Sequence, residues 1–278
     1  MNTILVPTDF STTAKNAALY ALKLAKQVGA KKIILYNTYQ TAMNVVPDPM
    51  VPALAVLDIE TIRQTSIDGL DQSKKQLDAF NEGIEIETLS EFNLLTEGIK
   101  TACENNSIDL IVMGITGGGE LKENLIGSNT ISVAKHITIP VIIVPANAEF
   151  TNIKNVMLVC DFEKVVETTP VNHIKKILDE TKAKLFVFNV DHNNKSFTPD
   201  KPFESLMLDT LFHGYAPEYH FADDPDFTEC INEFVEEQKI DIIISIPKKH
   251  GFFESLFKRS HTKMLAFHSH VPLMVIHE

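Results

Sequence analysis

The chain has 278 residues, of which 44% are apolar, so it has room for one large packed domain or for two domains of about 140 residues. A formal net charge of −12 disfavours nonspecific binding to nucleic acid or to an anionic membrane surface, and three cysteines without a C-x-x-C pair indicate neither a disulfide framework nor a zinc knuckle. No apolar run approaches the roughly 20 residues of a membrane span, and the opening MNTILVPTDF lacks the features of a signal peptide, so we expect a cytoplasmic protein.

Short apolar runs alternate with helical periodicity along the first half of the chain. Ser11 or Thr12 is suited to cap a helix whose apolar positions begin at Ala14, and Gly29 is suited to end it. Strands alternating with helices predict a parallel sheet with helices on both faces. The expected strands are 4–7, 33–36, 84–89, 108–113 and 141–144, the expected helices 12–28, 54–80, 95–104 and 129–135, and the proline-rich stretch 41–53 is expected to be a loop.

The same pattern then starts again. The run 156–162 parallels 4–10 at an offset of 152, whereas 240–243 parallels 108–111 and Pro272 parallels Pro140 at an offset of 132. The 20-residue difference matches the longer proline-rich loop of the first half. A period near 140 is far too long for a solenoid. We therefore predict two homologous α/β domains, residues 1–147 and 148–278.

A glycine-rich loop follows the fourth expected strand. Gly114, Gly117, Gly127 and Ser128 form the pattern G-x2-G-x9-G-S between a buried strand and a helix that begins at Ser128. Such a loop brings backbone N–H groups close to an anion, and the helix N-terminus adds oriented donors. The pattern favours a phosphate cradle, although the run Gly117–Gly119 alone would be read as a flexible turn. Neither a P-loop nor a G-x-G-x-x-G motif is present.

This glycine pattern, together with Pro-Thr-Asp-Phe-Ser at the end of the first strand, resembles the universal stress protein family, and the duplication resembles its tandem members. The resemblance implies two Rossmann-like domains, each an open five-stranded parallel sheet of order 3-2-1-4-5. It also implies ATP binding, in the subgroup that keeps this glycine motif. Because no arginine lies near the glycine-rich loop, we expect N–H groups and a Mg²⁺ ion to compensate the phosphate charge. In that order the switch point lies between strands one and four, where ligands of open α/β sheets bind.

The resemblance also implies which residues contact the nucleotide. Asp9 would approach the adenine or ribose, although a carboxylate after a strand is also a common cap for the next turn. The backbone around Asn37 would meet the base edge, and Ser128 would act both as N-cap and as phosphate donor. The full expected set is Thr8, Asp9, Asn37, Met113, Gly114, Gly117, Gly127, Ser128, Asn129 and Thr130.

The second half has lost this pattern. At the offset of 132, Gly114 corresponds to Ile246, Gly117 to Lys249 and Gly127 to Arg259, and only Ser128 is kept, as Ser260. We expect one nucleotide site per chain, in the first domain. The basic stretch 247–261 replaces the cradle, either as a solvated loop or as another anion or partner surface. No tight metal-ligand set stands out among the ten histidines, so no metal site is predicted.

Three kinds of function fit these features. The expected one is a non-catalytic, ATP-binding regulator or sensor of the stress response, because no base or charge stabiliser for phosphoryl transfer is evident. The alternatives are a slow ATPase or phosphotransferase, with Glu120 and Glu123 in the loop, and an interaction module with a structural nucleotide. The apolar strands 141–144 and 271–276 are expected to pair as an intramolecular pseudo-dimer, since sheet edges tend to be covered. A further homodimer is left open.

Overall fold

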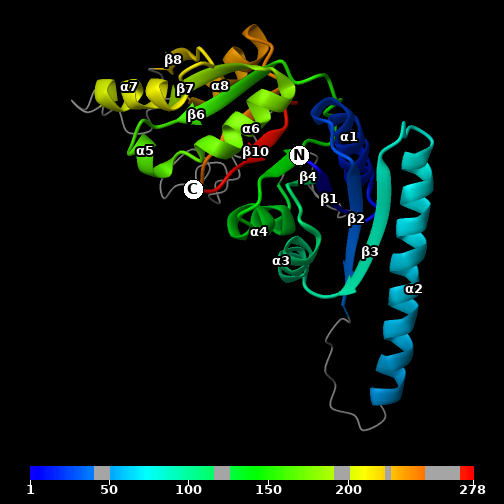
Figure 1. Cartoon of the computed structure of the whole chain (residues 1–278). Coiled ribbons are helices and arrows are strands. Elements are labelled where there is room, and N and C mark those ends of the chain that lie inside the picture. The colour runs from blue at the N-terminus through cyan, green and yellow to red at the C-terminus, as the bar shows by residue number, and fades with distance from the viewer. Residues whose placement is uncertain (41–50, 116–125, 191–200, 223–226, 248–269) are drawn as a thin grey trace.

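The computed structural model describes residues 1–40, 51–115, 126–190, 201–222, 227–247 and 270–278. Two halves with the same strand order build one continuous sheet (Figure 1). The first half comprises β1 (Thr3–Pro7), α1 (Thr12–Val28), β2 (Lys32–Tyr39), α2 (Val51–Asp78), β3 (Glu85–Phe92), α3 (Leu95–Asn106), β4 (Leu110–Gly114), α4 (Ser128–His136) and β5 (Val141–Val144). The second comprises β6 (Asn155–Cys160), α5 (Val165–Thr168), α6 (Val171–Thr181), β7 (Lys184–Val190), α7 (Lys201–Leu211), β8 (Glu218–Ala222), α8 (Phe227–Glu237), β9 (Ile242–Ser245) and β10 (Leu273–Val275).

The ten strands run in the order β3-β2-β1-β4-β5-β10-β9-β6-β7-β8. Each half therefore has the predicted order 3-2-1-4-5, and all pairs within a half are parallel. The halves meet where β5 and β10 pair antiparallel, with Met274 opposite Ile142. The predicted pairing of the two fifth strands is thus confirmed, and each strand covers an edge that the other half would otherwise leave open.

Helices cover both faces of the sheet. Helices α1, α2, α6 and α7 contribute to an apolar core on one face, and α3, α4 and α8 contribute to the core on the other. The central strands β1, β4 and β5 are buried along their whole length, which explains why their sequences are apolar without alternation. This layering leaves the carboxyl ends of β1 and β4 as the natural location for a ligand.

Both ends of α1 confirm the prediction from sequence. The Ser11 hydroxyl accepts a hydrogen bond from Ala14 N, and Gly29 ends the helix in the left-handed conformation at φ 70°. The proline-rich stretch is shorter than predicted, because α2 already begins at Val51. Pro52 lies in the first turn of that helix, where a missing N–H costs no intrahelical bond. The rest of the stretch, 41–50, lies outside the described residues.

One carboxylate in each half ties the start of the first strand to the start of the fourth. Asp109 Oδ2 accepts from the backbone of Asn2 at 2.7 Å and of Thr3 at 3.3 Å. Asp241, its counterpart 132 residues later, accepts from the backbone of Lys154 at 2.8 Å and of Asn155 at 2.9 Å. The duplication seen in the sequence is therefore repeated in the hydrogen bonds. None of the described helices is long and apolar enough to cross a membrane.

Candidate functional site

The end of β1 sends neighbouring side chains to opposite faces of the sheet. Thr8 is buried and lines a cavity between α1 and α2, whereas Asp9 is exposed and lines a cavity beside α3 and α4. The two expected ligand residues therefore do not reach the same space, as the alternation of side chains along an extended chain requires.

Asp9 also has a local structural role. Its Oδ1 accepts from Ser11 N at 3.1 Å, which closes a tight turn before α1. Asp161 makes the same contact with Glu163 N at 3.0 Å in the second half. The aspartate therefore caps the turn in both halves. The observation that favours an additional role for Asp9 in ligand binding is its position in the lining of the α3–α4 cavity.

Asn37 uses its side chain inside the protein. Its amide nitrogen donates to Thr8 O at 2.6 Å, and its amide oxygen accepts from the Ser66 hydroxyl at 2.6 Å. Asn189 repeats the first contact on Cys160 O at 3.0 Å. The next residue, Thr38, is the one whose side chain lines the α3–α4 cavity. A contact from the Asn37 backbone to a base edge stays a prediction.

Gly114 ends β4 at a point where Thr13 of α1 lies close to its backbone. A Cβ at this position would lie 2.9 Å from Thr13 Cγ2 and 3.1 Å from Thr13 C and O. The glycine is therefore required by packing of the two backbones, not by a left-handed dihedral. Met113 beside it is buried in the core under α3 and α4.

The two ends of the glycine-rich loop lie next to each other. Ile115 N donates to Val144 O at 2.9 Å, and Gly127 N donates to Ile115 O at 2.8 Å. Residues 116–125, which include Gly117, Gly118, Gly119, Glu120, Lys122 and Glu123, lie outside the described residues. The loop thus leaves β4 and returns to it at the carboxyl end of the sheet, directly before α4.

The N-terminus of α4 corrects one prediction. Gly127, at φ −65° and ψ 148°, is the N-cap, and Ser128 is the first helical residue, so Ser128 does not cap the helix. A glycine cap offers no side chain to the N–H groups of the first turn, and no side-chain cap bond is formed. Ser128 and Asn129 are exposed there. Thr130 is buried, and its hydroxyl donates to Gly114 O at 3.1 Å, which ties the helix to β4.

A cavity of about 520 Å³ lies at this end of the sheet. Asp9 at the end of β1 and Asn129 in the first turn of α4 both line it, so the structure brings these two predicted residues to one space. Its remaining walls come from the end of β2 and the start of α3. The lining residues that the sequence did not single out are Thr38, Gln40, Leu94, Leu95, Thr96, Glu97, Lys100, Ser132 and His136.

Some of these additional lining residues could have been predicted from their helical spacing relative to Asn129. Ser132 and His136 lie three and seven positions after Asn129, on the same face of α4. The Thr96 and Ser132 hydroxyls are 2.9 Å apart and join α3 to α4 across the cavity wall. Thr96 and Lys100 share a face of α3 in the same way, but only the tertiary fold shows that this face meets α4.

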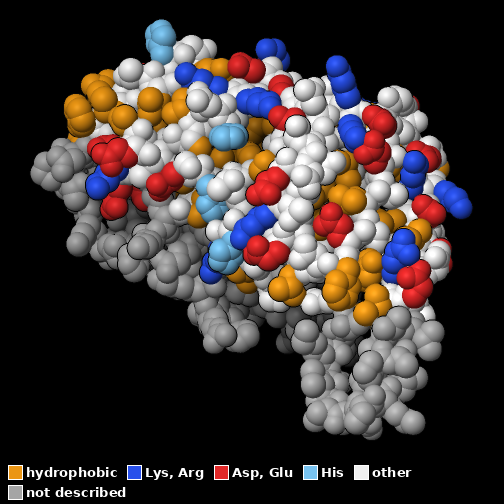
Figure 2. All heavy atoms as spheres, turned by 60° about the horizontal axis from the view of Figure 1, so that its bottom comes forward, with side chains coloured by type: hydrophobic (Ala, Val, Ile, Leu, Met, Phe, Trp, Pro, Cys, Tyr) orange, Lys and Arg blue, Asp and Glu red, His pale blue; other side chains and the backbone are white. Residues whose placement is uncertain are grey.

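Two basic residues, Lys100 and His136, line the cavity. Lys135 is exposed and does not line it, and Lys122 lies outside the described residues. Lys100 Nζ is 2.9 Å from Glu97 Oε1, and His136 Nδ1 is 2.9 Å from Ser132 O. Figure 2 shows acidic and basic side chains interspersed over the described part of one face.

Two further observations concern covalent and metal chemistry near the described part of the site. Burial and the nearby Glu104 carboxylate raise the pKa of the Cys103 thiol on α3 to about 11, so this thiol is not an activated nucleophile. In the part of the chain that the structure describes, no three His, Cys, Asp or Glu side chains form a group that could hold a metal ion. The described lining of the cavity combines charged and polar side chains with the apolar Leu94 and Leu95.

The corresponding place in the second half is occupied differently. Ile246, at the position of Gly114, follows β9 and is 7% exposed. An apolar side chain thus fills the place where the first half brings two backbones together. Lys249, Arg259 and Ser260, with most of the basic stretch 247–261, lie outside the described residues.

Comparison with known proteins agrees with this architecture. The model of the universal stress protein family matches residues 1–145. Universal stress protein MJ0531 of Methanocaldococcus jannaschii is 29% identical over 143 residues, which cover 51% of this chain and 80% of that protein. Universal stress protein MJ0577 of the same organism is 28% identical over 153 residues, covering 51% of this chain and 93% of that protein.

A solved structure resembles the whole chain. The crystal structure of a universal stress protein from Archaeoglobus fulgidus DSM 4304 superposes with a TM-score of 0.68 and 19% identity, covering 99% of this chain and 98% of that one. At that identity the likeness concerns the fold, which includes the second half that the family model does not reach. The family match spans more than half of the chain, and the chain therefore belongs to the universal stress protein family.

Proposed function

We propose that this chain binds one adenine nucleotide, ATP, in the α3–α4 cavity of its first half and acts as a regulatory sensor in a stress response, with little or no turnover. The observation that carries the proposal is the shared lining of that cavity. Asp9 from the end of β1 and Asn129 from the first turn of α4, which has no side-chain cap, line one space of about 520 Å³, large enough for a small-molecule ligand.

The N-terminus of α4 supports an anion at one end of this space. Because Gly127 provides no side-chain cap, the first-turn N–H groups of the helix are available to a ligand. The positive end of the helix dipole points the same way, and Lys100 adds a cationic side chain along the wall, where the His136 ring adds a further hydrogen-bonding group. A phosphate chain is the ligand group that uses all of these features together.

The glycine loop is proposed to complete the phosphate site. Its two ends are joined by the bond from Gly127 N to Ile115 O, so its backbone starts and finishes beside the α4 N-terminus. Gly117, Gly127, Ser128 and Asn129 are the residues that we expect at the phosphates. Thr8 and Thr130 are proposed to support the neighbouring residues that contact the nucleotide, since their own side chains are buried.

A magnesium ion would be held mainly by the nucleotide. Asp9 and Glu97 are the carboxylates that line the cavity, and a Mg²⁺ bound to phosphates commonly takes one or two protein carboxylates and keeps several waters. The ion would neutralise part of the phosphate charge in a protein whose net charge is −12.

The proposal is tested by denaturing the purified protein after loading with ATP and identifying the released nucleotide. Recovery of intact ATP in a one-to-one ratio is the expected result for a sensor. Recovery of ADP from the ATP load would show turnover and favour the slow ATPase reading instead. Recovery of no nucleotide after loading would contradict the proposed site.

A further inference from the structure

A second cavity lies between α1 and α2, on the face of the sheet opposite α3 and α4. Its volume is about 160 Å³. The sheet contributes Leu35 to its floor, and Ala18 and Leu77 enclose it from the two helices; all three are buried. Phe80 stands at its mouth with 62% of its surface exposed, so the cavity opens to solvent beside an aromatic ring.

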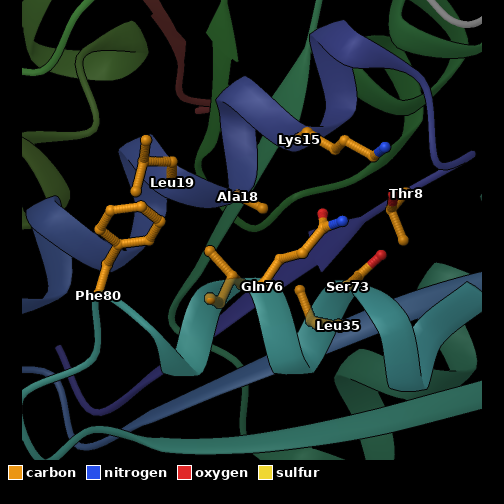
Figure 3. A pocket seen from close by; sticks show the side chains of 9 residues that line it. Thr8, Lys15, Ala18, Leu19, Leu35, Ser73, Gln76 and Phe80 are labelled. Carbon is orange, nitrogen blue, oxygen red and sulfur yellow. The ribbon is translucent and has the colours of Figure 1, made fainter.

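The two ends of this cavity differ in chemistry. Figure 3 shows Phe80 and Leu19 together at one end and the polar groups of Lys15, Thr8 and Ser73 at the other. A ligand that fills this space would therefore need an apolar body and a polar head. The apolar body would pack against the Phe80 ring, where another aromatic ring gains from edge-to-face or offset contact.

Lys15 and Thr8 supply donors at the polar end, whereas the Ser73 hydroxyl already donates to Gly69 O at 2.8 Å. None of the described residues forms an ion pair with the Lys15 ammonium group, whereas Lys26, Lys32 and Lys100 of the first half have acidic partners. The Thr8 hydroxyl oxygen accepts from Phe10 N at 3.0 Å, so its own proton remains for donation. An ammonium group and a hydroxyl proton at the same end of a cavity favour an anionic head group such as a carboxylate.

The size of the cavity limits the ligand further. A dry engineered protein cavity of about 150 Å³ holds one benzene molecule. The α1–α2 cavity of about 160 Å³ is thus matched to one aromatic ring. We infer that the α1–α2 cavity is a binding site for single-ring aromatic carboxylates, whose ring lies against Phe80 and Leu19 and whose carboxylate meets Lys15 and Thr8. This inference does not depend on nucleotide binding, because the two cavities lie on opposite faces of the sheet.

The site is tested by titrating benzoate into the full chain and following the methyl resonances of Leu19 and Leu77 by NMR. Benzamide serves as the neutral comparator of the same shape. Benzoate is expected to shift these methyls saturably, with a dissociation constant at least about tenfold lower than that of benzamide, a difference of about 1.4 kcal/mol. Absence of a saturable shift, or equal affinity for the two compounds, would overturn the inference.

Two substitutions separate the parts of the site. Lys15→Met keeps the apolar stem and removes the charge, so it should weaken benzoate about tenfold and leave benzamide unchanged. Lys23→Met is the matched control, since Lys23 is an exposed lysine of the same helix that does not line the cavity, and it should bind benzoate like the wild type. Equal loss in both lysine variants would indicate a general charge effect and overturn the role of Lys15.

Ala18→Leu fills the cavity from its wall with three additional carbon atoms. The empty volume leaves room for them, so the variant should fold, which a thermal melt of the same sample verifies. Benzoate should no longer shift the Leu19 and Leu77 methyls in this variant. A folded Ala18→Leu protein that binds benzoate like the wild type would exclude the α1–α2 cavity as the site.

Discussion

Lys176 Nζ lies 2.6 Å from Asp109 Oδ1, and this ion pair joins α6 of the second half to the start of β4 in the first. Burial alone would raise the pKa of Asp109, but the bonds from Lys176 Nζ and from the backbone of Asn2 and Thr3 outweigh it and hold the pKa below its usual range. The counterpart Asp241 receives a Thr151 hydroxyl in place of the lysine. Both halves thus have an aspartate that bonds the backbone at the start of their first strand. Only Asp109 of the first half also forms an ion pair with the other half.

The ion pair gives a pH-dependent contribution to stability. Because folding lowers the pKa of Asp109, its contribution is present above the unfolded pKa of about 3.9 and is lost as the pH falls through the lower folded value. Asp109→Asn should therefore reduce the free energy of unfolding by about 1 kcal/mol at pH 7, since both partners are partly exposed. Urea titrations at pH 7 and pH 2.5 test this. A difference that is as large at pH 2.5 as at pH 7 would contradict it.

Lys176→Met is the companion variant. If the pair itself is responsible, the double variant Asp109→Asn with Lys176→Met should lose less than the sum of the two single losses. Strict additivity would show that the two side chains contribute separately.

The contact between β4 and α1 makes Gly114 sensitive to one methyl group. Gly114→Ala should cost about 1–3 kcal/mol of stability, because its Cβ would lie 2.9 Å from Thr13 Cγ2 and 3.1 Å from backbone atoms of the same residue. Adding Thr13→Ser removes the Cγ2 clash and should restore part of the loss, but not the part that comes from the backbone. Denaturation midpoints of the two single variants and the double variant measure this, and an unchanged midpoint in Gly114→Ala would be evidence against the close approach.

Asp9 and Asp161 provide an internal comparison for ligand binding. Each accepts one backbone N–H two residues further on, at 3.1 Å and 3.0 Å, so alanine at either position should destabilise the protein by a similar amount, about 1 kcal/mol. Only Asp9 lines the α3–α4 cavity. Titration with a fluorescent ATP analogue should therefore show weaker binding by Asp9→Ala and unchanged binding by Asp161→Ala. Equal effects of the two variants would mean that Asp9 matters only for the turn.

The β5–β10 pairing predicts how separated halves behave. We propose the division at residues 147 and 148, in the segment between β5 and β6, where Asn16 Nδ2 bonds Pro145, Ala146 and Ala148 carbonyls. Residues 1–147 alone would expose the apolar edge of β5 and should dimerise through it. Adding residues 148–278 should replace that dimer by a one-to-one complex with the mass of the whole chain, 31.1 kDa, in light scattering. A first half that stays monomeric and does not bind the second would contradict this account.

The sheet could be predicted from sequence because its signals are local and repeated. Apolar runs mark the buried strands, Gly29 marks the end of α1, and the offset between Asp9 and Asp161 reveals the duplication. The strand order came from family resemblance, and the pairing of β5 with β10 followed from the need to cover an edge. The positions of the strands and the duplication depend on hydrophobic periodicity and composition, which can be read along the whole sequence.

The walls of the site could be predicted only in part. Asp9 and Asn129 were expected, but Lys100 and His136 line the cavity only because α3 packs beside α4, which no short-range pattern encodes. Ser128 is predicted as the N-cap because serine favours that position, but the helix begins one residue earlier than this prediction requires, so Gly127 is the N-cap. The need for a glycine at position 114 likewise depends on Thr13, which is about a hundred residues away in sequence and packs against it only in the folded protein.

The central claim, one nucleotide site per chain in the first half, is tested most directly by calorimetric titration of ATP into the full chain, with Gly127→Ala and Gly127→Arg as variants. Gly127 has φ −65°, so alanine fits its backbone and should bind ATP much like the wild type, whereas arginine places a bulky side chain at the proposed phosphates. We expect one bound ATP per wild-type chain and no bound ATP in Gly127→Arg. Two sites per chain, no binding by the wild type, or unchanged binding by a folded Gly127→Arg protein would contradict it.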